Sequence, residues 1–368
     1  MLKLPSYQEL SREQDAVNNL SLDSSHLIVG PPGTGKTILA LYRAARLKAA
    51  GKHVLFLTFN RTLMQYIEQA AKEIEMEDCV TTFHSWFYSW YRTTFSKHPP
   101  QIEPFVFDWM KIYQHMVASN PQVKQYDHLI IDEAQDLPSQ LYVVLRAIAE
   151  NITVFADENQ RITEYHSTIE QIQTCMGLSH YHKLTRNYRN SRNIAEFAGA
   201  FYAGLQSGIP DLPERKGPLP RAISTRNLEE QIAFIARYER NNSDKDVAVF
   251  VATSKQQYAI MKMLQRYQMK NKVQMYISKN YNYQGLNFHG RGIKILAYPS
   301  SKGLDFDAVF LPDLDCRQPS PGSDYEKMRF YVMTSRAREE LFLMYSGVLL
   351  PPLLQQVSQH LFEKESLI

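Results

Sequence analysis

The sequence predicts an α/β fold of two tandem domains, each built on a parallel sheet with helices on both faces. Apolar runs of strand length alternate with runs of helix length through both halves of the chain, and this alternation is typical of parallel sheets. A chain of 368 residues, of which 44% are hydrophobic, is long and apolar enough for two separate cores. We expect the two domains to meet near residue 180.

The first domain, residues 1–180, shows the alternation most clearly. Its first strand, residues 25–30, runs directly into a loop rich in glycine, and the helix that follows starts at Lys36 and is stopped by Gly51. Short apolar runs bounded by polar residues mark the other strands. The remaining elements expected here are strands at 53–58, 79–83, 128–132 and 152–156 and a helix at 62–76.

The second domain, residues 181–350, repeats the pattern. Residues 208–220 are rich in glycine and proline and are expected to form a loop inside its first crossover, and residues 351–368 are expected to be a C-terminal tail. The expected strands are 220–224, 246–252, 273–277, 292–297 and 307–312, the expected helices are 228–240 and 254–268, and a last helix and strand span 324–346.

Composition argues against several classes of protein. No apolar run is long enough to span a bilayer and no N-terminal segment has the form of a signal peptide, so we expect a cytoplasmic protein. The three cysteines, Cys79, Cys175 and Cys316, are far apart and lack the spacing of a zinc site. We therefore expect neither a disulfide framework nor structural zinc.

Residues 30–37 read GPPGTGKT, the full pattern of a phosphate-binding loop. Glycines allow the backbone N–H groups to surround phosphate oxygens at the start of a helix. Lys36 would reach the β- and γ-phosphates, and Thr37 would bind Mg²⁺. An ordinary turn does not explain Lys-Thr directly after the third glycine, so the octet predicts a nucleoside triphosphate site. Its residues are Gly30, Pro31, Pro32, Gly33, Thr34, Gly35, Lys36 and Thr37.

A second nucleotide signal is an apolar strand that ends in two adjacent carboxylates, Asp132 and Glu133. Asp132 can hold Mg²⁺, and Glu133 can orient or deprotonate the water that attacks the γ-phosphate. The alternative role for a carboxylate here is to cap the helix near Ser139, which suits Asp136. Beside a phosphate loop, the adjacent pair indicates hydrolysis rather than nucleotide storage.

Seven further motifs accompany these two sites. They are LSREQ at 10–14, TFNR at 58–61, TFHSW at 82–86, FADENQ at 155–160, LTRNYRNS at 184–191, SSKGLDF at 300–306 and VMTSRAR at 332–338. In this order the chain resembles the superfamily 1A helicases of the UvrD, Rep and PcrA type over nearly its whole length. The resemblance implies two RecA-like domains with an ATP cleft between them, the cofactors ATP and Mg²⁺, and movement from 3′ to 5′ on single-stranded DNA.

The resemblance also implies roles for single residues around the nucleotide. Charge on a transferring phosphoryl group calls for cations from the far side of the cleft, and in comparable hydrolases such an arginine finger contributes roughly 10³ to 10⁵ in rate. Arg186 and Arg338 are interpreted as structural or peripheral. The implied roles are adenine contact for Gln14 and Tyr188, ribose contact for Asp305, γ-phosphate sensing for Gln160, and phosphoryl contact for Arg189 and Arg336.

Contacts with single-stranded DNA are implied in the same way, because aromatic rings stack on bases while hydroxyls and histidines meet phosphates. An alternative role for Phe59 is core packing at a strand end. The family's Thr and His in the fifth motif are replaced by Ala297 and Pro299, so the resemblance does not carry over two of the family's DNA contacts. The implied contact residues are Thr58, Phe59, His84 and Tyr165.

A basic segment supports nucleic acid as a partner. No acidic residue lies between Asp246 and Asp305, and the cations there are interleaved with aromatics, a mixture suited to a phosphate backbone with stackable bases. The alternative is a solvated helix face with a few core aromatics. The segment contains Lys255, Lys262, Arg266, Lys270, Lys272, Lys279, Arg291, Lys294 and Lys302, with Tyr267, Tyr276, Tyr281, Tyr283 and Phe288.

The large insertions of the resembling helicases are reduced or absent. Only residues 87–126 interrupt the first domain, and they are rich in aromatic residues. Such a cluster most often forms a small core against its parent domain. A surface that binds a partner or stacks on a single strand is the alternative.

These observations together predict an ATP-hydrolysing motor on single-stranded DNA, with RNA as another option and with a protein partner, such as a nuclease or accessory subunit, assisting unwinding. The competing hypothesis is a regulatory NTPase that switches a partner protein and does not translocate processively. The two replacements in the fifth motif favour that alternative, while the basic segment and Tyr165 argue against it.

Overall fold

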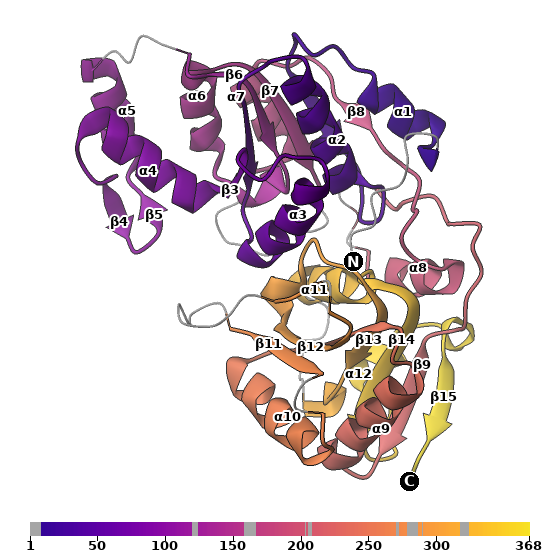
Figure 1. The fold of residues 1–368 in the computed structure, drawn as a ribbon. Coiled ribbons are helices and arrows are strands. Elements are labelled where there is room, and N and C mark those ends of the chain that lie inside the picture. Colours follow the sequence, from indigo (N-terminus) through magenta and orange to yellow (C-terminus); the bar gives the residue numbers. More distant parts are fainter. Residues whose placement is uncertain are drawn as a thin grey trace.

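Two parallel sheets, one in each half of the chain, organise the protein (Figure 1). This computed structural model describes residues 9–119, 124–157, 167–202, 204, 208–269, 272–277, 286–288, 290–316 and 324–368. In Figure 1 the first half, indigo to magenta, forms the upper body and the second half, orange to yellow, forms the lower one. Among the described residues, no helix combines the length and apolar character needed to cross a membrane.

The first sheet has six strands in the order β3, β2, β6, β7, β1, β8, all paired in parallel. Alternate residues of a strand point to opposite faces. Ile28 and Phe56 therefore pack under α2 and α3, while Leu27 and Leu57 pack under α4, α6 and α7. The elements are β1 (His26–Val29), β2 (Val54–Thr58), β3 (Val80–Thr82), β6 (Tyr126–Ile131), β7 (Ala149–Ala156), β8 (His182–Lys183), α1 (Arg12–Asn18), α2 (Lys36–Ala49), α3 (Arg61–Glu73), α4 (Phe83–Phe95), the 3₁₀ turn η2 (Ala134–Asp136), α6 (Ser139–Ile148) and α7 (Ile169–Met176).

The second sheet has seven strands in the order β11, β12, β10, β13, β14, β9, β15, again all parallel. Ile223 and Val249 face α9 and α10, whereas Ala222 and Phe250 face α8 and α11. The elements are α8 (Arg192–Gly199), β9 (Arg221–Thr225), α9 (Leu228–Asn241), β10 (Asp246–Val251), α10 (Ser254–Arg266), β11 (Val273–Tyr276), β12 (Gly292–Ala297), η4 (Tyr298–Ser301), β13 (Phe306–Leu311), η5 (Leu314–Cys316), α11 (Asp324–Thr334), β14 (Ala337–Ser346), α12 (Pro352–Gln355), η6 (Gln359–Leu361) and β15 (Glu363–Ser366).

The predicted α/β fold with two parallel sheets is confirmed, and each predicted strand is present within two or three residues of its predicted ends. Two edge strands were not predicted. The short β8 pairs with β1, and β15 lies beside β9, so residues 363–366 belong to the second sheet although we expected a tail there. Because the first sheet ends at Lys183 and α8 packs on the second domain, we place the boundary between Lys183 and Arg192.

The aromatic insertion consists of the end of α4, a hairpin of β4 (Gln101–Glu103) and β5 (Val106–Phe107), and α5 (Trp109–Ser119). Phe87, Trp90 and Tyr91 are buried and share one core with the first sheet. The expectation of a small core against the parent domain is therefore confirmed for these rings. Phe105, at the hairpin turn, is 58% exposed.

Helix α3 makes one of the contacts between the two domains. Thr62 Oγ1 donates a 2.8 Å hydrogen bond to the carbonyl of Ser300, and Tyr66 donates one of 2.6 Å to Asp305. Leu63 lies so close to Gly303 that a Cβ on this glycine would collide with it. These contacts bring the start of α3 against the loop between β12 and β13.

Candidate active site

A cavity of about 420 Å³ lies between the two domains. It opens where the carboxyl ends of the first sheet's strands meet loops of the second domain, the usual position for a ligand in an α/β fold. The cavity is lined by Glu9, Gln14, Pro32, Gly33, Gly35, Lys36, Thr37, Ile38, Tyr66, Glu133, Tyr188, Arg189, Arg215, Gly303, Asp305, Arg336 and Arg338.

The loop at residues 30–37 has the backbone that phosphate binding requires. Gly33 and Gly35 both have φ of +86°, a region that favours glycine. A Cβ at Gly33 would collide with Asn187, and one at Gly35 would collide with Gln14. Gly35 also precedes α2 without any side-chain cap, so the first N–H groups of this helix remain available to an anion.

Other residues of this loop hold its shape. Thr34 is fully buried, and its hydroxyl donates a 3.0 Å hydrogen bond to the carbonyl of Pro31. Gly30 packs against Thr34 and Leu184, whereas Pro32 lines the cavity. Thr34 and Gly30, both predicted as nucleotide contacts, therefore act here through the loop's conformation.

The Lys36 ammonium lies under the loop. Its Nζ donates hydrogen bonds of 2.6 Å to Gly30 O and 3.0 Å to Pro31 O, and it lies 3.6 Å from Asp157 Oδ2. The side chain is 7% exposed, so its charge is largely shielded from water. To bind phosphate, Lys36 has to exchange these carbonyl contacts for phosphate oxygens.

Thr37 and Asp132 form the predicted magnesium pair. Thr37 Oγ1 donates a 2.6 Å hydrogen bond to Asp132 Oδ2, so both oxygens are close enough to share one cation. Burial, followed by the charge of Glu133, raises the pKa of Asp132 to about 7. No group of three or more Asp, Glu, His or Cys forms a metal site in the described part of the chain. The pair fits Mg²⁺, which usually keeps several waters and binds substrate phosphates as well.

Glu133 lies at the turn after β6 and has φ of +53°, uncommon for a residue with a side chain. Gln135 Nε2 donates a 2.6 Å hydrogen bond to Glu133 Oε2, and Gln135 Oε1 in turn accepts the N–H of Asp157. Burial alone would raise the pKa of Glu133, but the charges of Lys302 and Lys36 lower it below its ordinary value. The carboxylate is therefore held ionised at the cavity wall, as a base requires.

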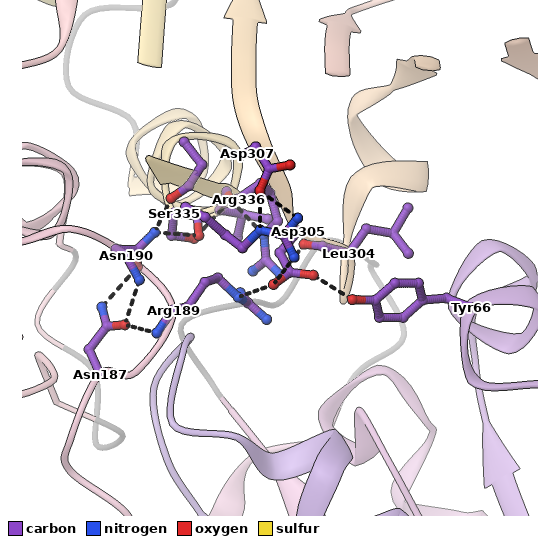
Figure 2. Close-up of polar contacts among 12 residues, drawn as sticks. Tyr66, Asn187, Arg189, Asn190, Leu304, Asp305, Asp307, Ser335 and Arg336 are labelled. Carbon is purple, nitrogen blue, oxygen red and sulfur yellow. Dashed lines mark hydrogen bonds and ion pairs between the residues drawn. The ribbon is translucent and has the colours of Figure 1, made fainter. Parts of the chain in front are cut away.

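Arg189 and Arg336 approach the same cavity from the second domain (Figure 2). Arg189 Nε lies 3.8 Å from Asp305 Oδ2, while its buried Nη1 has no hydrogen-bond partner among the described residues. Arg336 Nε donates a 2.9 Å hydrogen bond to Val332 O. Burial, and then the neighbouring Arg189, lower the pKa of Arg336 to about 9. Two cations that line one cavity, of which Arg336 is fully buried, fit an anionic ligand.

Asn190 connects the two loops that carry these arginines, as Figure 2 shows. Its Nδ2 donates hydrogen bonds of 3.0 Å to Ser335 O and 2.5 Å to Ala337 O. Asn187 Oδ1 accepts the backbone N–H of Arg189 at 3.0 Å and that of Asn190 at 3.2 Å. The same set of hydrogen bonds thus positions the loops of both Arg189 and Arg336.

The three residues assigned to the nucleoside also line the cavity. Gln14 Nε2 donates a 3.1 Å hydrogen bond to Thr34 O, and its Oε1 accepts the N–H of Ser11. One N–H and one lone pair of this amide remain for a base. Tyr188 is 41% exposed at the rim, which leaves a ring face for stacking. Asp305 also lines the cavity, at the second domain's side.

Of the predicted nucleic-acid contacts, Phe59 and His84 lie together, with ring centroids 5.6 Å apart. They line a second cavity of about 290 Å³, with Phe105 and Phe107 of the insertion on its other wall. Burial, and then Arg61, lower the pKa of His84 to about 4. His84 is therefore neutral at physiological pH and cannot attract phosphate as a cation.

Three other predictions have different outcomes. Thr58, the last residue of β2, is fully buried, so its hydroxyl is not accessible to nucleic acid in this conformation. Gln160 and Tyr165 lie outside the described residues.

The basic segment is less available to nucleic acid than its sequence indicates. Lys294 is fully buried, and its Nζ lies 2.5 Å from Asp246 Oδ1. Lys302 is also buried, and so are Tyr276 and Phe288. The sequence alone assigns Lys294 to a basic surface, but the side chain lies in a buried strand and forms an ion pair there.

Several residues of the site escaped sequence reasoning. Lys302 contacts Asp136 and Glu133, and Tyr66 contacts Asp305. Arg338, interpreted above as peripheral, lines the cavity and lies 3.7 Å from Asp305 Oδ2. The sequence indicates the site roles of these residues only weakly, because each one joins the site through contacts with segments that are distant in sequence.

Comparison with known families finds two matches. Residues 13–166 match a family described as an AAA domain, and residues 109–286 match one described as the viral superfamily 1 RNA helicase core domain. Among solved structures, the C-terminal domain of a possible DNA helicase from Lactobacillus plantarum WCFS1 is 22% identical, with 48% of this chain and 97% of that chain covered and a TM-score of 0.36. No curated protein matches.

Proposed function

We propose that the chain has the core of a superfamily 1 helicase and is a UvrD-like motor that hydrolyses Mg²⁺-bound ATP to move along single-stranded DNA. The two family matches and the two parallel sheets support a nucleotide-dependent helicase with two α/β domains. The roles proposed for single residues rest on the geometry of the cavity between the domains.

The observation that carries the proposal is the division of one site between two domains. The first domain contributes the phosphate loop, the Thr37–Asp132 pair and Glu133, while the second contributes Arg189 and Arg336. A site divided in this way is complete only when the domains are in contact. Hydrolysis is then coupled to opening and closing of the cleft, which is the movement that a motor needs.

Each side chain has a distinct task in this proposal. The N–H groups before α2 and the Lys36 ammonium bind phosphate oxygens. Thr37 and Asp132 would hold Mg²⁺, which would supply positive charge against the phosphates. Glu133 orients the attacking water and accepts its proton, while Arg189 and Arg336 stabilise charge on the transferring group.

Strand binding is supported by the aromatic cavity beside Phe59. Phe59 is half-buried. Its cavity is lined largely by apolar rings, and the size of the cavity suits a nucleobase. A 3′ to 5′ direction follows only from the resemblance. The insertion at 87–126 is small, and it exposes apolar side chains such as Ile102, Phe105 and Val117 that a partner could cover. We therefore propose that a protein partner, for example a nuclease or accessory subunit, assists unwinding.

The experiment that tests this proposal measures steady-state ATP hydrolysis with no nucleic acid, with single-stranded DNA and with single-stranded RNA. We expect stimulation by DNA, and we expect weak opening of a forked duplex by the purified chain alone. Stimulation by RNA only would replace the DNA substrate with RNA. Processive opening of long duplexes by the chain alone would contradict the need for a partner.

A regulatory NTPase is the second candidate, and Pro299 is the observation in its favour. Pro299 takes the place of the family's histidine, and its carbonyl accepts a 3.4 Å hydrogen bond from Asn60 Nδ2 within the domain contact. This loop thus connects two domains instead of presenting a polar side chain to a strand. ATP hydrolysis that is indifferent to every nucleic acid would favour this function over the motor.

A further inference from the structure

We propose that Lys302 is a positioning residue for ATP hydrolysis, supplied by the second domain to hold Glu133 of the first. The inference rests on the hydrolysis proposed above. Lys302 follows η4 in the second domain, but its side chain enters the first. Its Nζ lies 2.5 Å from Asp136 Oδ2 and 3.7 Å from Glu133 Oε2, and the side chain is 3% exposed.

The contacts on Glu133 orient its carboxylate. Lys302 approaches Oε2, and Gln135 Nε2 donates a 2.6 Å hydrogen bond to the same oxygen. The other oxygen, Oε1, is then the one that can accept a proton from a water in the cavity. Because Lys302 and Gln135 come from different domains, rotation of this carboxylate is restrained from two sides.

Charge balance explains why a cation is needed at this point. Asp132, Glu133 and Asp136 are three carboxylates within five residues, and all three are buried. Asp136 Oδ1 has no hydrogen-bond partner among the described residues, so Lys302 is the main compensation for this carboxylate. Removing one partner of a buried ion pair leaves an uncompensated charge and is strongly destabilising to the local arrangement.

The backbone of Lys302 is held in register by the first domain. Thr62 Oγ1 donates a 2.8 Å hydrogen bond to Ser300 O, and Asn60 Nδ2 lies 3.5 Å from Lys302 O. Asn60 follows directly after Phe59, the proposed stacking residue, and Thr62 lies two positions further on. Separation of the domains would break these contacts and withdraw Lys302 from Glu133. The ion pair therefore makes the base competent only in the closed arrangement.

Lys302→Met tests the inference, since it keeps the length of the side chain and removes the ammonium. We expect kcat of the basal ATPase to fall by about 10²-fold, the effect of a small misplacement of a catalytic group, with KM for ATP changed less than threefold. Lys302→Arg should recover part of the rate. Asp136→Asn should also lower kcat, and the double variant should be no slower than Lys302→Met, because both changes break one interaction.

Lys294→Met is the matched control, because Lys294 forms a buried pair with Asp246 at the same 2.5 Å distance, within the second domain. It should lose thermal stability like Lys302→Met while the kcat per folded molecule stays near that of the unmodified chain. Equal losses of kcat in the two variants, or more than half the normal kcat in Lys302→Met, would overturn the inference. An unmodified chain without any ATPase would instead overturn the proposed function itself.

Discussion

Tyr66 on α3 donates a 2.6 Å hydrogen bond to Asp305 Oδ1, across the contact between the two domains (Figure 2). The other oxygen of this carboxylate lies 3.8 Å from Arg189 Nε and 3.7 Å from Arg338 Nη1. Burial alone would raise the pKa of Asp305, but Arg338 and Arg189 lower it below its ordinary value. One carboxylate thus connects a helix of the first domain with a finger of the second.

Tyr66→Phe should loosen this connection. The change leaves Asp305 Oδ1 without its donor, which costs about 1–3 kcal/mol of unfolding free energy, and frees the carboxylate to draw Arg189 away from phosphate. We expect kcat to fall severalfold. Tyr238→Phe is the matched control, since Tyr238 donates a 2.6 Å hydrogen bond to Glu340 inside the second domain. Chemical unfolding and steady-state ATPase assays measure both effects, and equal kcat in the two variants would contradict the role of Tyr66.

Glu133→Gln should abolish turnover and leave nucleotide binding intact, because the phosphate loop and the Thr37–Asp132 pair remain while the base is lost. A loss of about 10²- to 10⁴-fold is typical of a general base. Lys36→Ala should weaken binding and turnover together. Fluorescent-nucleotide titration and ATPase assays separate the two outcomes. Near-normal hydrolysis by Glu133→Gln would mean that another residue is the base.

Arg189→Ala and Arg336→Ala should each lower turnover far more than ATP affinity, by up to about 10³-fold, since both cations act on charge that develops during transfer. Arg186→Ala is the control, because Arg186 is half-exposed, pairs with Glu214 and does not line the cavity. Single-turnover hydrolysis with saturating single-stranded DNA is the appropriate measurement. A wild-type rate in either variant would show that the replaced arginine does not stabilise the transferring phosphoryl group.

Mg²⁺ dependence should vary with pH through Asp132. Its pKa of about 7 means that the carboxylate is mostly protonated at pH 6 and mostly ionised at pH 8. Protons and Mg²⁺ compete for it, so about tenfold more Mg²⁺ should be needed for half-maximal nucleotide binding at pH 6 than at pH 8. Asp132→Asn is the control, because any pH effect that remains in this variant comes from titration of the nucleotide or of another group. The same pH effect in this variant would exclude Asp132 as the cause.

Phe59→Ala should reduce DNA-stimulated hydrolysis and spare the rate without DNA, because base stacking contributes about 1–3 kcal/mol per base. Tyr258→Ala is the control, as Tyr258 is half-exposed on α10. Fluorescence anisotropy with a labelled oligonucleotide should show weaker binding only for Phe59→Ala. Equal loss of both rates, with a lower melting temperature, would indicate core packing instead.

The sequence by itself determined the alternation of strands and helices, the phosphate loop and the carboxylate pair, because these depend on neighbours along the chain. Gly33 to Thr37 and Asp132 to Glu133 are short contiguous patterns whose chemistry follows from spacing. The short edge strands β8 and β15 were not predicted from the sequence, since each is only a few residues long and its pairing partner is remote in sequence.

Only the tertiary structure decided which charges meet. Lys302 and Asp136 are 166 positions apart and Tyr66 and Asp305 are 239 apart, so no local pattern relates them. Folding likewise buried Lys294 against Asp246, although the sequence places it in a basic segment open to nucleic acid. An ion pair depends on distance and burial, and both are set by the packing of the two domains rather than by the order of residues.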